Sequence, residues 1–107
     1  MGEQEQQERR KYKRFPYRED ILIDNSIQAY SQNISQDGMF LCTANPPEKD
    51  SVITVTIPLK VTVKAIVRNY QAGIGMGIRF IDLTDDQKMM IKQLLEEIKS
   101  AFEKTQQ

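Results

Sequence analysis

The clearest pattern in the chain is an alternation of apolar and polar residues between positions 51 and 70. Apolar side chains occupy every odd position from 53 to 67, namely Ile53, Val55, Ile57, Leu59, Val61, Val63, Ala65 and Val67. A period of two with many β-branched residues is typical of strands that have one face in water. Pro58 interrupts the run, because proline has no N–H to donate to a neighbouring strand. The pattern therefore predicts two strands, about 51–57 and 61–70, with a tight connection between them.

Shorter apolar segments predict four more strands, at 21–23, 26–31, 39–43 and 76–81. Asp24 and Asn25 separate the first two, and this pair favours a tight hairpin turn. Pro46 and Pro47 mark a loop after the third, because prolines remove backbone donors and fix the chain. Residues 69–75 form a second predicted turn region.

The C-terminal part of the chain predicts a single helix over residues 84–103. Thr84 fits the N-cap of this helix, and Gln87 fits the third position of a capping box. Asp85 and Asp86 lie where the helix dipole favours negative charge. One face carries an apolar stripe made of Ile91, Leu94, Leu95, Ile98 and Phe102. A stripe of this kind usually packs against its own domain, and a dimerisation face is the alternative interpretation.

These elements predict a single domain of the all-β class with a C-terminal helix. A chain of 107 residues can bury one modest core. Six short strands followed by one helix favour a small six-stranded antiparallel β-barrel, since closure removes exposed strand edges. The expected parts are a flexible tail (1–8) and a domain (9–103) that consists of an arm (9–20), the barrel (21–81) and the helix (84–103). We expect residues 104–107 to fray.

Composition argues against catalysis and against a metal centre. The chain has no histidine, which is the commonest general base and metal ligand, and it has a single cysteine. Cys42 therefore has no disulfide partner within the chain, and its apolar surroundings predict a buried thiol. No nucleotide-binding loop or nucleophile motif occurs, so we expect no enzyme activity. The lack of paired cysteines, of a signal peptide and of a long apolar segment predicts a cytoplasmic protein that does not insert into membranes.

Positive charge is concentrated near the N-terminus although the chain as a whole is neutral. The sequence has 15 basic and 15 acidic residues, yet six of the ten residues from Arg9 to Arg18 are cationic. Such a cluster can bind an anion without making the whole protein basic. Arginine suits this role, because its planar fork grips a phosphate, or the O6 and N7 edge of guanine, with two hydrogen bonds. Pro16 keeps Phe15 out of helical geometry, so we expect an extended or irregular arm that is mobile without a partner.

A polar turn follows the second predicted strand and reads N-x-S-x-x-G from Asn33 to Gly38. Asn33 can donate and accept hydrogen bonds at a base edge, and Ser35 can bind a phosphate or cap the turn. Gly38 can adopt a positive φ. These are also ordinary turn residues, so the turn and the basic run are each weak evidence for function when taken alone. Together they indicate a small binding module for a phosphate-bearing ligand.

The order of these motifs along the chain resembles the PilZ domain family. An R-x-x-x-R pair precedes a strand pair, the [D/N]-x-S-x-x-G turn, the paired apolar strands, and a G-x-G-I-R-F segment before the helix. The resemblance extends from about residue 9 to residue 102 and is carried by the ordered pair of motifs. It implies a stand-alone PilZ-like barrel that binds the bacterial second messenger cyclic di-GMP.

The resemblance also implies which residues bind the ligand. In the family, two arginines of a flexible arm fold over the ligand, and the turn holds a guanine at the barrel surface. The matching positions in this chain, with the residue before the first arginine, are Arg9, Arg10, Arg14, Asn33, Ser35 and Gly38. The residue before the first arginine affects whether one ligand or a stacked pair is bound, and a cation there favours the pair. Asn33 replaces a more usual aspartate, and Asp37 stands where many members have a second glycine.

Some assignments stay open. Arg18 lies four residues after Arg14, so Arg14 with Arg18 is an alternative to Arg10 with Arg14. Arg68 and Arg79 lie at outward strand positions, which are more often solvated than functional. A structural adaptor of the same fold that binds no nucleotide is one alternative function. A small nucleic-acid-binding barrel is another, although the strands lack an aromatic platform. The expected partners are cyclic di-GMP and a downstream protein that the sequence does not identify, with a homodimer as a further alternative.

Overall fold

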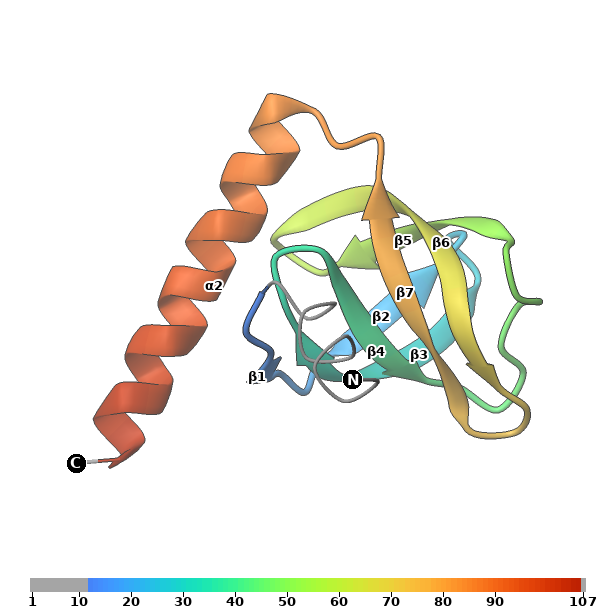
Figure 1. The fold of residues 1–107 in the computed structure, drawn as a ribbon, viewed down its shortest axis with the longest axis horizontal. Coiled ribbons are helices and arrows are strands. Elements are labelled where there is room, and N and C mark those ends of the chain that lie inside the picture. The colour runs from blue at the N-terminus through green and yellow to red at the C-terminus, as the bar shows by residue number, and fades with distance from the viewer. Residues whose placement is uncertain (1–11, 107) are drawn as a thin grey trace, which may run out of the picture.

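Six strands close into a barrel in the computed structural model of the chain, and one helix packs against the side of the barrel (Figure 1). The structure describes residues 12–106. In chain order the elements are β1 (Phe15–Pro16), β2 (Asp20–Ile23), β3 (Ile27–Ile34), β4 (Gly38–Cys42), β5 (Val52–Ile57), β6 (Val61–Gln71), β7 (Gly75–Ile81) and α2 (Asp85–Gln106).

The barrel closes because β3 pairs with β2 along one edge and with β4 along the other. The sheet order is β1-β3-β2-β5-β6-β7-β4, and the additional β3–β4 pairing completes the ring. All of these pairings are antiparallel. The two-residue β1 continues the line of β2 along β3, where Phe15 pairs with Ile34. The predicted fold, a six-stranded antiparallel barrel with a C-terminal helix, is confirmed.

The alternating pattern of residues 53–67 fills the barrel interior. The buried positions are Ile53, Val55, Ile57, Val61, Val63, Ala65 and Val67. The exception is Leu59, whose side chain is fully exposed. Leu59 lies in the turn between β5 and β6 with a φ of 62°, and the Lys60 N–H closes this turn on the Ile57 carbonyl at 3.0 Å. A turn residue does not follow strand alternation, so the periodicity fails at this position.

Two glycines allow the pairing of β4 with β7 that closes the barrel. Gly38 and Gly75 lie at the two ends of this pairing. A Cβ at Gly38 would lie 2.1 Å from the carbonyl oxygen of Ile78, and one at Gly75 would lie 2.2 Å from that of Leu41. Both distances are far shorter than a van der Waals contact. The two backbones therefore approach this closely only because neither position carries a side chain.

The predicted capping box begins α2 and also helps to attach it to the barrel. The Thr84 N–H donates to Gln87 Oε1 at 2.8 Å, and the Gln87 N–H donates to Thr84 Oγ1 at 3.1 Å. These bonds satisfy N–H groups at the helix start. The Gln87 amide also donates to the Thr62 carbonyl at 2.9 Å, and Lys60 pairs with Glu97 at 2.9 Å. The β5–β6 hairpin therefore lies along α2.

Several predicted boundaries are wrong because pairing extends the strands beyond their apolar residues. β3 continues to Ile34, so Asn33 lies in a strand opposite Phe40 instead of in the turn. β6 continues to Gln71, which pairs with Gly75, and the predicted turn region shrinks to residues 72–74. The sequence pattern does not predict β1 at all.

Three other expectations also need correction. α2 continues to Gln106, beyond the predicted helix end at residue 103, because its regular hydrogen bonding extends past its apolar stripe. Ile91 and Leu94 of that stripe are buried, whereas Phe102 is exposed. The thiol of Cys42 is half-buried instead of buried, since Cys42 is the last residue of β4.

Replacement of Gly38 by alanine is expected to destabilise the barrel severely. The added Cβ would collide with the Ile78 carbonyl oxygen, so β4 and β7 would have to separate. We expect the free energy of unfolding to fall by more than about 2 kcal/mol in urea denaturation. The matched control is Gly73→Asn, because a Cβ at Gly73 meets nothing within 4 Å and its φ of 75° is one that asparagine tolerates. Similar losses in both variants would contradict the close-approach argument.

Candidate functional site

The arm pairs with the last residues of β3, on the side of β3 that also pairs with β2. Phe15 and Pro16 pair with Ile34 and Asn33, and the next residue, Tyr17, donates its N–H to the Gln32 carbonyl at 3.1 Å. This pairing places the residues just before Phe15 beside the last residues of β3. The arm and the N-x-S-x-x-G segment, which are 19 residues apart at Arg14 and Asn33, therefore lie side by side.

A buried hydroxyl holds the arm to the barrel where β1 passes into β2. Residues 17–19 bulge away from β3 here, because the register with β3 changes by one residue between β1 and β2. Ser31 is fully buried beneath this bulge. Its Oγ accepts a hydrogen bond from the Glu19 N–H at 2.9 Å and donates one to the Tyr17 carbonyl at 2.6 Å. One serine thus satisfies two backbone groups that the sheet leaves unpaired.

Arg14 and Asn33 form the direct contact between the two motifs. Arg14 Nη1 donates a hydrogen bond to Asn33 Oδ1 at 2.7 Å. The bond is exposed to solvent, and the partner is a neutral amide instead of a carboxylate. Within residues 12–106 this is the guanidinium's only side-chain hydrogen bond, so its other N–H donors have no partner there. A ligand that offers a better acceptor can replace the amide at a modest cost in free energy.

The turn itself is stabilised by Ser35 and Asp37. Ser35 is fully buried, and its Oγ donates to Asp37 Oδ1 at 2.5 Å. The Ser35 N–H donates to the Gly38 carbonyl at 2.8 Å, which closes the turn between β3 and β4. The Asp37 carbonyl accepts from the Phe80 N–H on β7 at 2.9 Å. Ser35 therefore caps the turn, which is one of the two roles expected for it, and the turn is fixed to the barrel.

Gly38 has a different role from the one predicted. The sequence suggested a positive φ, but among residues 12–106 the only glycine with positive φ is Gly73. Gly38 is the first residue of β4, and it is required because β4 passes so close to β7. The error arises because the same residue type serves tight turns and close backbone contacts.

A cavity of about 530 Å³ opens beside the turn, between β7 and α2. Gln36 and Asp37 line it from the turn, Arg79 and Phe80 from β7, and Tyr12 from the start of the arm. Lys88 and Ile91 line it from α2, with Leu83 of the connecting segment. The arm and the turn thus border the same cavity, which is large enough for a nucleotide-sized group.

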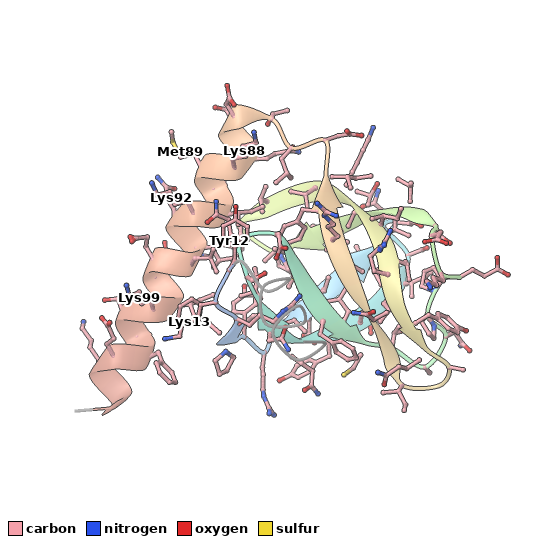
Figure 2. The ribbon with its side chains drawn as sticks, in the orientation of Figure 1. Tyr12, Lys13, Lys88, Met89, Lys92 and Lys99 are labelled. Atoms are coloured by element: carbon pink, nitrogen blue, oxygen red, sulfur yellow. The ribbon has the colours of Figure 1, made fainter. Side chains whose placement is uncertain are left out.

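Exposed lysines lie on α2 and on the arm. Figure 2 shows Lys88, Lys92 and Lys99 along the length of α2, with Tyr12 and Lys13 between the helix and the barrel. All four lysines are exposed, and the Lys13 ammonium lies 5.5 Å from the centre of the Phe15 ring, within the range of a cation–π contact. Of the four lysines only Lys88 lines the cavity, whose wall also contains Asp37 and Arg79.

Tyr17 lies between the arm and α2. Burial raises the pKa of its phenol above the ordinary value, and the nearby carboxylates of Glu19 and Glu97 raise the pKa further. Glu19 belongs to the arm and Glu97 to α2, so carboxylates of both segments influence the pKa of the phenol. Tyr17 also packs on the hydrophobic core, as do Leu95 and Ile98 of α2. The arm therefore lies beside the helix as well as beside β3.

The structure brings together four of the six predicted site residues, Arg14, Asn33, Ser35 and Gly38. Arg9, Arg10 and the predicted tail (1–8) lie outside the described residues. Arg18 is exposed in the bulge that follows β1. Within residues 12–106 no group of acidic and cysteine side chains is placed to hold a metal ion. Sequence reasoning missed Ser31 as an anchor, because a serine at an inward strand position gives no signal of its own.

Replacement of Ser31 by alanine is expected to loosen the arm. The Glu19 N–H and the Tyr17 carbonyl would lose their partner, which costs about 1–3 kcal/mol for buried groups. Urea denaturation should show this loss in the free energy of unfolding. Ser100→Ala on the exposed part of α2 is the matched control and should change that quantity by less than about 0.5 kcal/mol. Equal effects of the two substitutions would show that Ser31 is no anchor.

Comparison with protein families agrees with this arrangement. The model of the PilZ domain matches residues 8–97, which include both motifs and every strand of the barrel. A search of curated proteins finds no match to the chain. No helix within residues 12–106 is long and apolar enough to cross a lipid bilayer. PilZ domains are cyclic di-GMP-binding modules and not enzymes. The match covers most of the chain, so this protein belongs to the PilZ domain family.

Proposed function

We propose that this domain is a receptor for cyclic di-GMP that acts without catalysis, and that it holds the ligand between the arm and the turn. The observation that carries the proposal is the hydrogen bond from Arg14 to Asn33, which joins the two motifs at 2.7 Å. Both segments also border a cavity, the arm through Tyr12 and the turn through Gln36 and Asp37. The ligand is an anion with two phosphates and two guanine bases, and Lys88 and Arg79 in the cavity wall supply positive charge that favours its approach.

Arg14 and Asn33 have complementary chemistry for such a ligand. The guanidinium donates to a phosphate, or to O6 and N7 of guanine, in a bidentate manner. The amide of Asn33 both donates and accepts, so it can pair with a guanine edge once Arg14 moves away. Ser35 and Gly38 act by holding the turn in place instead of by direct contact, since Ser35 is fully buried and Gly38 has no side chain. Arg10, with Arg9 before it, supplies the second half of the arginine clamp in this proposal.

Ligand binding would change the surface that the domain presents to a partner protein. Arg14 lies three residues before Tyr17, and β1 contacts α2. A movement of the arm toward the ligand therefore alters the contact between the arm and the helix. This change, together with the bound ligand, is the proposed signal for a downstream partner.

The rival interpretation, an adaptor that binds no nucleotide, predicts an arm whose arginines are neutralised by carboxylates. The partner of Arg14 is an amide, and no ion pair involves this residue within the described part of the chain. An ion-paired arginine would have to exchange one charged partner for another. An arginine bonded to an exposed amide gains a charge–charge interaction when it meets a phosphate, and this difference favours the receptor.

Titration calorimetry with cyclic di-GMP tests the proposal. The unmodified protein should bind, and Arg14→Ala should lose at least about 1.5 kcal/mol of binding free energy, roughly a tenfold weaker Kd, since a hydrogen bond to a charged group is removed. Arg18→Ala removes the same charge four residues away and should bind as the unmodified protein does. A strong loss in Arg18→Ala would instead support the pairing of Arg14 with Arg18. Absence of binding by the unmodified protein at high micromolar ligand would refute the receptor function.

A further inference from the structure

Three lysines form a row along one side of α2, which we call the lysine row. Lys88, Lys92 and Lys99 are spaced at i, i+4 and i+11, and this spacing places them within about 40° of one another around the helix axis. All three side chains are exposed, and Figure 2 shows them along the length of the helix. None of them forms an ion pair within residues 12–106. The row therefore offers three ammonium groups to an anionic partner.

The carboxylates of α2 do not occupy the lysine row. Each lysine has a carboxylate three or four positions away along the helix, namely Asp85, Glu96 and Glu103. Among residues 12–106 none of these carboxylates pairs with a lysine of the row. They do lower the net charge of the helix, so the attraction of the row for an anion acts at short range. A matching partner needs carboxylates that are spaced to meet the individual lysines.

The chain itself carries a spaced anionic segment directly before the arm. The tail (1–8), which lies outside the described residues, contains no lysine or arginine and three glutamates, namely Glu3, Glu5 and Glu8. The described chain begins at Tyr12, which lines the cavity together with Lys88. The tail is therefore tethered only a few residues from the end of the row at which Lys88 lies.

The lengths of the two segments also match. Glu3 to Glu8 extends over at most about 16 Å, at about 3.3 Å per residue, and Lys88 to Lys99 covers about 16 Å at about 1.5 Å per residue. Glu8 is four residues before Tyr12 and so has a reach of about 13 Å from it. Single exposed ion pairs are weak, but a tether gives the tail a high effective concentration at the row. Several weak pairs are then sufficient for docking.

We propose that the tail docks on the lysine row of α2 and acts as an autoinhibitory segment. Docking draws the residues between Glu8 and Tyr12 toward the helix, including Arg9 and Arg10, and a tail carboxylate neutralises Lys88 in the cavity wall. The regulatory part of the inference rests on the proposed function, since the arm has to leave the helix before it closes on cyclic di-GMP. The docked tail therefore lowers the affinity for this ligand.

Zero-length cross-linking with a carbodiimide tests the docking on the unmodified protein without ligand, because the reagent joins only carboxylates and amines that touch. Mass spectrometry of the monomer should find the tail glutamates joined to the lysine row. A NaCl concentration of about 1 M should reduce the yield at least about fivefold, since the Debye length is then about 3 Å. The control is Lys104, an exposed lysine about 140° around the axis of α2 from the row, which should give at least about fivefold less product.

Three outcomes of the cross-linking would overturn the docking. They are equal yields at Lys104 and at the row, no product at the row, and product in a covalent dimer only. The last of these would assign the row to a second copy of the chain.

The autoinhibition is tested by titration calorimetry of the double variant Lys92→Gln, Lys99→Gln with cyclic di-GMP. Neither lysine lines the cavity, and their removal should release the tail, so the ligand should bind at least about twofold more tightly. General electrostatics predicts the opposite, because two cations are lost and the ligand is an anion. Unchanged or weaker binding would therefore overturn the autoinhibition.

A second variant locates this effect in the tail. Combined replacement of the three tail glutamates by glutamine should tighten binding of cyclic di-GMP at least about threefold. In that background Lys92→Gln with Lys99→Gln should bring no further gain, because both sets of substitutions break the same contact. Independent and additive gains would contradict a contact between the tail and the row.

Failure of this inference is distinguishable from failure of the receptor function. If the unmodified protein binds cyclic di-GMP and Arg14→Ala weakens it, while the tail glutamates show no preference for the lysine row, only the docking is wrong. If the cross-links form at the row but the unmodified protein does not bind cyclic di-GMP, the receptor function and the autoinhibition are refuted and the docking stands.

Discussion

The pairing of β4 with β7, bounded by two positions that carry no side chain, is the constraint on which the rest of the structure depends. It closes the barrel, and it also fixes the turn of the candidate site, because Gly38 ends the turn and begins the strand. The Asp37 carbonyl is bonded to Phe80 within the same pairing. The turn is therefore continuous with the barrel wall and is held by the sheet. Asn33 and Asp37 are held in place in the same way.

The other half of the site is attached less firmly. Ser31 anchors the bulge at Tyr17 and Glu19 from inside the barrel, whereas Arg14 lies outside it and is attached through one exposed hydrogen bond. Residues 12–14 adopt neither helix nor strand. The acceptor groups of the turn are thus fixed to the barrel, whereas the donor groups of Arg14 are held by a single hydrogen bond. Under the proposed function, part of the binding free energy would be used to order the arm, and this ordering would produce the ligand-dependent surface.

Much of the fold was predictable from local patterns. The alternation through Ile53 and Val67 identified the central strands, and Thr84 with Gln87 identified the helix start, because both depend on neighbours in sequence. Long-range pairing was not predictable in the same way. Asn33 and Gln71 read as loop residues, but partners across the sheet keep them in strands. Leu59 reads as a core residue, but its turn places it in water.

The candidate site also contains some features that local sequence predicts and others that depend on long-range pairing. The spacing of the motifs pointed to Arg14 and Asn33, and the structure shows that they touch. The reason for Gly38 could not be read from its position in the motif, since the nearby Ile78 carbonyl is 40 residues away in the chain. Arg79 is exposed at an outward strand position, as expected, and it also lines the cavity between β7 and α2. Ser31 could be recognised only once the register of β1 and β2 on β3 was known.

The short strand β1 has a consequence for how this domain can assemble with other molecules. Each strand of the closed ring has a neighbour on both sides, and among the described strands β1 alone pairs with a single neighbour. Its other edge is two residues long, and Pro16 has no N–H to offer. Addition of a foreign strand at this edge, which can lead to aggregation of β proteins, therefore has almost no template. A chain that docks beside β1 must use side chains instead of backbone pairing.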